Sequence, residues 1–221
     1  HYEQTKSQAD SPAKSRAQNL RSFARIIQTN LSLGKLSTAD KGLAELPMLI
    51  DELAKTAGEE KVPHHRAMLH RHHSTLCTLR AMLFDYRPQN AKASKEGLLQ
   101  EAIKHSDECD GISKGMSWSQ TRNNEPDKTG IGIAALKKAQ ALYVARNYAE
   151  SRDCAVDAAG ILAGYPNNRW WRMCCHDVAS RCWAKLGDIA RAEEHIEIAW
   201  NVFAQSDRND HILSLIHISE P

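Results

Sequence analysis

The sequence lacks any apolar run close to the roughly 18 residues that a membrane-spanning helix needs, and no apolar signal-peptide core follows its N-terminus. It also has no stretch in which apolar and polar residues alternate with period two, so no β-sheet is predicted. Its formal net charge of +2 gives no general argument for nucleic-acid binding. We therefore expect an intracellular, cytoplasmic or nuclear protein that has no membrane segment.

Motifs of catalysis are missing as well. There is no glycine-rich phosphate loop, no HExxH zinc motif and no GxSxG nucleophile turn. The six cysteines are spread along helical patterns instead of CxxC pairs, which favours a reducing compartment over a disulfide scaffold. Cys175 and His176 are adjacent, and adjacent residues on a helix do not face each other. We predict no enzyme activity, no catalytic residue and no cofactor.

Apolar residues recur at helical spacing along most of the chain, which predicts an all-α protein. Pro47 lies inside one of the predicted helices, so we expect a kink or break near Leu46. The eight predicted helices span residues 12–31, 36–56, 63–86, 91–106, 130–146, 149–163, 168–186 and 189–206.

These helices suggest two pairs of hairpins, at 12–106 and 130–206. The polar segment 107–129 between them contains several glycines and is predicted to be an exposed loop or hinge. Trp118 in this segment either docks back on the helices or belongs to a recognition peptide. Residues 1–11 are predicted to be disordered.

The ends of the chain suggest a fragment. No initiator methionine is present, and residues 213–221 resemble a translated sequencing-library adapter. We therefore expect the tail 207–221 to end in non-native residues, and we exclude 213–221 from fold reasoning.

One pattern occurs three times, beginning at Leu33-Gly34, Arg146-Asn147 and Leu186-Gly187. Each copy has a tight turn, one apolar residue, a small residue three positions later, and then apolar residues at helical spacing. A recurring helix–turn–helix unit is typical of helical solenoids, which commonly bind other proteins.

These hairpins resemble tetratricopeptide repeats, which place small residues where two helices cross and a Gly-Asp-Tyr-like sequence at the turn. The last hairpin supplies Ser180, Trp183, Gly187-Asp188-Ile189, Ala192 and Ala199. The hairpin before it supplies Ala139, Leu142, Asn147-Tyr148, Ser151 and Ala158, and the first supplies Ile27, Gly34-Lys35-Leu36, Ala39 and Leu46. The resemblance implies an α-solenoid of about four stacked hairpins, with Ala139 and Ala192 buried at helix contacts. An irregular helical bundle is the alternative.

The resemblance also implies a function, a protein–protein interaction scaffold or adaptor. The first helix of each pair would line a concave face that binds a peptide or helix of a partner protein. Arg181 and Lys185 would then pair with an acidic group of that partner. A regulatory repeat region of a larger signalling protein is compatible with this hypothesis. The predicted partner-binding residues are Arg21, Gln28, Gln140, Tyr143, Asp177, Arg181 and Lys185.

The segment 61–84 is rich in histidine and arginine and contains no acidic residue. An alternative function is therefore anion or nucleic-acid binding through one stripe of this helix. The stripe consists of Arg66, His70, His73 and Arg80. His70, His73 and Cys77 also have spacings that suit metal ligands, but no fourth ligand is evident, so no metal site is assigned. A merely solvated helix face is the remaining interpretation, and salt dependence would separate phosphate binding from peptide binding.

Overall fold

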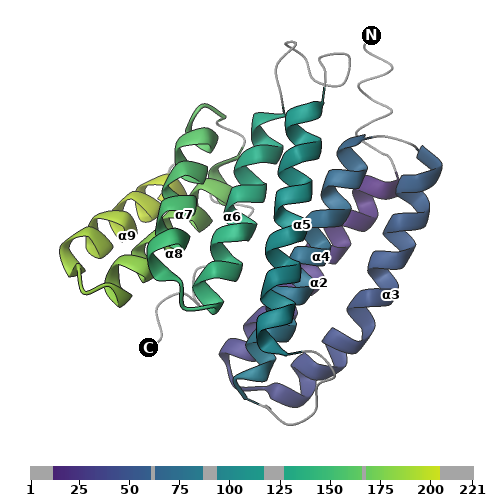
Figure 1. The fold of residues 1–221 in the computed structure, drawn as a ribbon, viewed down its shortest axis with the longest axis horizontal. Coiled ribbons are helices and arrows are strands. Elements are labelled where there is room, and N and C mark those ends of the chain that lie inside the picture. The colour runs from purple at the N-terminus through teal and green to yellow at the C-terminus, as the bar shows by residue number, and fades with distance from the viewer. Residues whose placement is uncertain (1–11, 61–62, 87–93, 117–126, 166–167, 205–221) are drawn as a thin grey trace.

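The computed structural model describes residues 12–60, 63–86, 94–116, 127–165 and 168–204. Within these ranges every regular element is a helix, which confirms the all-α prediction (Figure 1). None of the described helices is long and apolar enough to cross a membrane. Residues 1–11, Trp118 and the tail 207–221 lie outside the described ranges. The helices are α2 (Pro12–Ser32), α3 (Leu36–Glu60), α4 (Pro63–Phe84), α5 (Lys95–Gly115), α6 (Lys128–Val144), α7 (Tyr148–Ala163), α8 (Arg169–Lys185) and α9 (Ile189–Ala204).

Two sequence predictions about these helices need correction. The segment 107–115, predicted as part of a loop or hinge, is the last part of α5. It is helical because Cys109 is fully buried in a cluster with Ala67 of α4 and Ala134 of α6. Of the kink or break predicted near Leu46, the break is wrong, because α3 continues through Pro47. Buried residues on both sides of Pro47, including Leu46 and Ile50, pack into one core and hold the two halves together.

The three copies of the turn pattern have the same backbone geometry. Gly34, Arg146 and Gly187 occupy equivalent positions, and each has a positive φ, of 68°, 63° and 87° respectively. In each turn the next residue donates its N–H to a carbonyl five residues back, as in Lys35 to Asn30 at 2.8 Å. This is the Schellman geometry that ends a helix, and glycine suits it because it has no Cβ. The sequence repeat therefore corresponds to a structural repeat of the turns.

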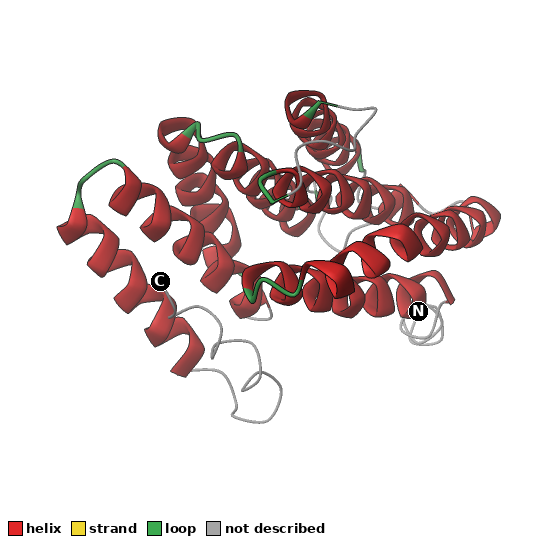
Figure 2. Ribbon diagram, turned by 90° about the horizontal axis from the view of Figure 1, so that it is seen from below, coloured by secondary structure: helices red, strands yellow, loops and turns green. Residues whose placement is uncertain are grey.

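Helices that follow one another along the chain pack side by side, with the α8–α9 hairpin at one end of the molecule and α2 and α3 at the other (Figures 1 and 2). The even-numbered helices also contact one another in the series α2, α4, α6 and α8. The odd-numbered helices pack mainly against the helices that precede and follow them. The even-numbered helices thus form one continuous layer.

Small residues lie at buried positions between neighbouring helices. Ala139 is fully buried and Ala192 is 4% exposed, which confirms both burial predictions. Between α6 and α7 the hydroxyl of Ser151 donates to the carbonyl oxygen of Ala139 at 2.7 Å. Short side chains at these positions allow the backbones to approach, as the repeat pattern predicts.

Candidate binding pocket between the even-numbered helices

A pocket of about 110 Å³ lies between α2, α4, α6 and α8, and all four helices contribute to its wall. Three of the predicted partner-binding residues, Arg21, Gln28 and Gln140, line it. A cavity needs only about 10–15 Å³ of such volume to hold one water molecule, so this pocket is large enough for several non-hydrogen atoms. The pocket therefore has room for a carboxylate or phosphate group and a short part of the chain that carries it.

The wall of the pocket is strongly cationic. Arg21 and Arg25 come from α2, Arg71 from α4 and Lys137 from α6. Among the described residues that line the pocket there is no aspartate or glutamate. Within the described part of the chain, none of these four groups forms an ion pair with a carboxylate. Four positive charges thus surround one small space, and none of the described residues that line it carries a negative charge.

Two tryptophans of α8 hold three of the cationic groups. The guanidinium carbon of Arg25 lies 4.1 Å from the centroid of the Trp170 ring, and that of Arg21 lies 4.9 Å from the Trp171 ring. The Lys137 ammonium lies 5.7 Å from the same Trp171 ring. Aromatic faces attract cations without neutralising them. The tryptophans therefore position these charges and leave them available to an anion.

Arg71 is the most deeply placed cation and is 9% exposed. Its Nε donates to the Cys109 sulfur at 3.4 Å, and one terminal nitrogen has no hydrogen-bond partner within the described residues. Asp127 is near enough to interact with Arg71, but it accepts a hydrogen bond from the Gly130 N–H at 2.9 Å and pairs with His64 at 3.4 Å. A buried donor without a partner is uncommon in folded proteins. Arg71 is thus able to bind a further acceptor.

Burial and the neighbouring positive charges lower the pKa of two groups that line the pocket, Lys137 and His72. The pKa of Lys137 falls to about 8, mainly through burial, with further lowering by Arg21, Arg25 and Arg71. Burial and the neighbouring cations likewise lower the pKa of His72 to about 3, so this imidazole is neutral at pH 7. Lys137 is still mostly charged at pH 7. The positive charge of the pocket therefore comes from arginine and lysine and not from histidine.

The remaining predicted partner-binding residues lie further along α6 and α8. Arg181 forms an ion pair with Asp177, with 3.0 Å between Nε and Oδ1. The Tyr143 ring packs against Tyr148 at a centroid distance of 5.5 Å. Lys185 is exposed at the end of α8. The predicted set is therefore divided between the pocket and the surface beyond it.

Sequence reasoning missed the residues that make the pocket cationic and aromatic, namely Arg25, Arg71, Lys137, Trp170 and Trp171. One signal was present in the sequence. The helix α2 contains no acidic residue, so Arg21 and Arg25, one turn apart, have no carboxylate on their own helix with which to pair. The cations that join them from α4 and α6 are brought near only by the packing of the helices.

The structure separates the residues of the predicted anion-binding stripe. Arg66 and Arg80 are exposed, whereas His70 pairs with Glu108 of α5 at 2.9 Å and the His73 ring stacks on His105 at 4.9 Å. The two histidines in the middle of the stripe therefore contact α5, and the stripe does not form a continuous basic surface. Arg71, the one α4 cation that lines the pocket, is not part of this stripe.

Cys174 lines the pocket next to Cys175, so its reactivity bears on what the pocket can do. Burial raises the pKa of the Cys174 thiol to about 12. Burial also raises the pKa of Cys175 well above its usual range. A thiol is a good nucleophile only as a thiolate, so both groups are poorly reactive at neutral pH. The pocket is chemically suited to binding.

Comparison of the chain with protein-family models, with curated proteins and with solved structures finds no match. The resemblance to tetratricopeptide repeats therefore rests on the sequence pattern described above.

Proposed function

We propose that this chain is a protein-interaction module with a tetratricopeptide-like solenoid arrangement, and that it binds an acidic segment of a partner protein. The layer formed by α2, α4, α6 and α8 corresponds to the first helices of successive hairpins, which would line the concave face. The pocket lies within this layer and includes three of the residues expected there. These two observations support the proposed arrangement and the proposed position of the binding surface.

The observation that carries the proposal is the convergence of four cationic groups without a carboxylate among the described lining residues. Holding like charges together in a partly buried space costs free energy unless an opposite charge is added. A carboxylate would supply that charge, and guanidinium groups bind carboxylates through two parallel hydrogen bonds. Arg71, which lines the pocket and has one terminal nitrogen without a partner among the described residues, would be one such donor.

The shape of the pocket favours an acidic side chain over a nucleic acid. Nucleic-acid backbones bind along extended rows of basic groups that contact successive phosphates. Here the charges surround one cavity of about 110 Å³, and two tryptophans are part of its lining. A glutamate or aspartate could enter this space while the rest of the partner segment extends along α6 and α8. The polar residues Tyr143, Arg181 and Lys185 would lie beside that extension.

Binding of fluorescently labelled peptides tests the proposal. We expect the full chain to bind a glutamate-rich decapeptide and to bind the matching glutamine-rich decapeptide at least about tenfold more weakly. Arg25→Gln and Lys137→Met should each weaken binding of the acidic peptide by about tenfold. The matched control is Arg16→Gln. Arg16 belongs to α2, as Arg25 does, but its side chain is exposed and already forms an ion pair with Glu52 at 2.7 Å.

The same assay distinguishes the alternatives. A single-stranded oligonucleotide that displaced the peptide and bound more tightly than it would favour the nucleic-acid hypothesis instead. The double variant Arg181→Glu plus Lys185→Glu tests the surface beyond the pocket and should reduce affinity less than Arg25→Gln does. Equal binding of the two peptides, or equal loss in Arg16→Gln and Arg25→Gln, would contradict the proposed pocket.

A further inference from the structure

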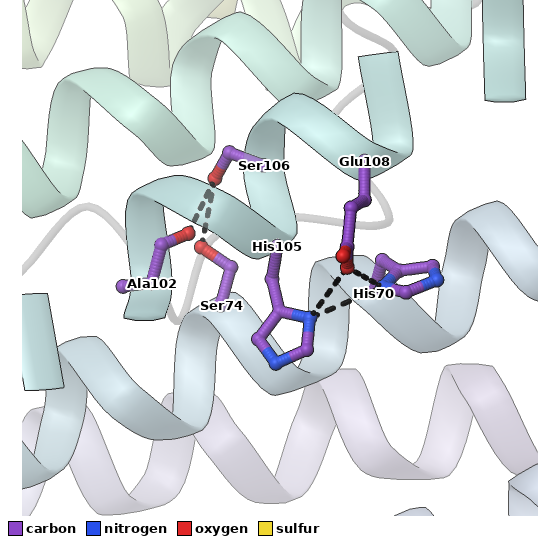
Figure 3. A network of polar contacts seen from close by, with 6 residues as sticks. All are labelled: His70, Ser74, Ala102, His105, Ser106 and Glu108. Carbon is purple, nitrogen blue, oxygen red and sulfur yellow. Dashed lines mark hydrogen bonds and ion pairs between the residues drawn. The ribbon is translucent and has the colours of Figure 1, made fainter. Parts of the chain in front are cut away.

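Three potential metal ligands meet between α4 and α5, away from the cationic pocket. His70 Nδ1 lies 2.9 Å from Glu108 Oε2, His105 Nδ1 lies 3.2 Å from the same oxygen, and the two Nδ1 atoms are 3.1 Å apart (Figure 3). Among the described residues this is the only place where three such groups come within 4.8 Å of one another. The three atoms form a nearly equilateral triangle.

Protons alone do not explain this triangle well. If both imidazoles carry a proton on Nδ1, the two donors can point at Glu108, but they also face each other at 3.1 Å. If one Nδ1 is unprotonated, its lone pair faces either a carboxylate oxygen or the other ring. Three lone pairs that converge on one point are all satisfied at once by a single cation.

The separations fit a tetrahedral metal ion. At the ~2.0–2.1 Å bond lengths usual for zinc, the ligand atoms of a tetrahedral site lie about 3.3 Å apart. The observed separations are slightly shorter, so modest side-chain movement would admit the ion. Two histidines and one glutamate are also a ligand set that zinc uses when its fourth position is left to water. We propose that His70, His105 and Glu108 bind one divalent transition-metal ion of the zinc class between α4 and α5.

Neighbouring contacts hold the ligands in position. The hydroxyl of Ser74, one turn along α4 from His70, is hydrogen-bonded at 2.9 Å to the hydroxyl of Ser106, the residue after His105, and both residues are buried (Figure 3). The His73 ring stacks on the His105 ring at 4.9 Å with 20° between the planes. The side chains of His70, His105 and Glu108 remain 22%, 19% and 39% exposed, which leaves a path for an ion from solvent. The site combines fixed helices with an accessible side.

The position of the site suggests what a bound ion does. His70 and Arg71 are consecutive residues of α4, and Glu108 and Cys109 are consecutive residues of α5. The metal ligands therefore lie next to the Arg71–Cys109 contact, which reaches 3.4 Å between the same two helices. An ion bound to both helices cross-links them and fixes their register.

Zinc titration of the full chain tests the site. We expect one zinc ion per chain by equilibrium dialysis with elemental analysis, and a rise of several degrees in the melting temperature when zinc, but not magnesium, is added. His105→Gln and Glu108→Gln should each lower zinc affinity by at least about tenfold and remove the rise. The matched control is the pair His176 and His195, whose Nδ1 atoms lie 3.0 Å apart. No carboxylate of the described residues completes a group of three there, so His195→Gln should leave zinc binding unchanged.

Cobalt provides a second measurement that does not depend on variants. Co²⁺ bound to two imidazoles and a carboxylate should give visible ligand-field bands without the near-ultraviolet charge-transfer band of a cobalt thiolate. A thiolate band would assign the metal to one of the six cysteines and overturn the site. The site is equally excluded if the chain binds no zinc, or if His105→Gln and Glu108→Gln bind it as tightly as the unchanged chain.

Discussion

The guanidinium group of Arg25 lies 4.1 Å from the ring centroid of Trp170, although most of the chain separates these two residues. Arg25 belongs to α2 and Trp170 to α8, so the contact spans the layer of even-numbered helices. It closes the pocket between the first and the last helix of that layer. The pocket therefore depends on the stacking of all four even-numbered helices and does not belong to any one hairpin.

Removing one buried charge from the pocket should stabilise the chain. The pKa of Lys137 in the folded protein is about 8, against an ordinary value of 10.5. The unfolded state therefore holds this proton more tightly, and the folded state is destabilised at pH 7. We expect Lys137→Met to increase the free energy of unfolding by about 1 kcal/mol at pH 7.

Urea unfolding at two pH values checks the cause of this effect. Because the folded pKa is depressed, the stability of the unchanged chain recovers as the pH rises from about 8 towards 10.5. The advantage of Lys137→Met should therefore shrink at pH 9.5. An advantage of the same size at both values would mean that improved packing, and not the removed charge, is responsible.

The turn between α6 and α7 contains a residue poorly suited to its backbone conformation. Arg146 has a φ of 63° and an exposed side chain, whereas the equivalent positions of the other two turns are glycines. Residues with a Cβ are disfavoured in this region of φ. Arg146→Gly should raise the free energy of unfolding by roughly 0.5–1 kcal/mol, and Gly187→Ala should lower it by about 1 kcal/mol. Thermal melts of the two variants give the comparison, and a destabilised Arg146→Gly would contradict the shared turn geometry.

Two glycines on facing helices should respond oppositely to alanine. A Cβ at Gly132 of α6 would lie 2.7 Å from Cγ of the buried Leu162, whereas a Cβ at Gly160 of α7 would have nothing within 4 Å. Gly132→Ala should therefore destabilise the chain by roughly 1–3 kcal/mol. Gly160→Ala should stabilise it by about 0.5–1 kcal/mol, because alanine is the better helix former. Chemical denaturation measures both, and similar changes in the two variants would mean that α6 and α7 do not approach as closely as described.

The α8–α9 hairpin should be sensitive to mild acid. Burial, then repulsion by His195 and Arg172, lowers the pKa of His176 from 6.5 to about 4. The folded state thus resists protonation that the unfolded state accepts. The associated stability is complete above pH 6.5 and is lost as the pH falls towards 4.

Between pH 7 and pH 5 this histidine alone should lower the free energy of unfolding by on the order of 1 kcal/mol. His176→Gln should reduce the loss by that amount, measured by urea unfolding at the two pH values. His195→Gln should reduce it partly, because one source of repulsion is removed. A pH dependence that neither variant changes would assign the acid sensitivity to other groups.

The sequence by itself determined the helices and the turns that repeat. Apolar spacing along one helix is a local property, so the eight segments were predicted close to their observed positions. The turns at Gly34, Arg146 and Gly187 were predicted for the same reason, since a turn depends on a few adjacent residues. Where local signals and packing disagreed, packing decided the outcome. Residues 107–115 are helical because Cys109 reaches a buried cluster that its own neighbours do not reveal.

Both sites depend on contacts that only the tertiary structure decides. Arg21 was predicted as a binding residue, but its companions Arg71 and Lys137 become neighbours only when three helices stack. His70 was predicted to share one exposed face of its helix with His73. In the structure His70 pairs with Glu108 of α5, which lies in a segment that was predicted to be a loop. Charge pairing acts through space over a few ångströms, and helix periodicity fixes only which face of one helix is apolar. The sequence therefore determines the helices and their turns, and the packing of those helices decides which charged groups meet.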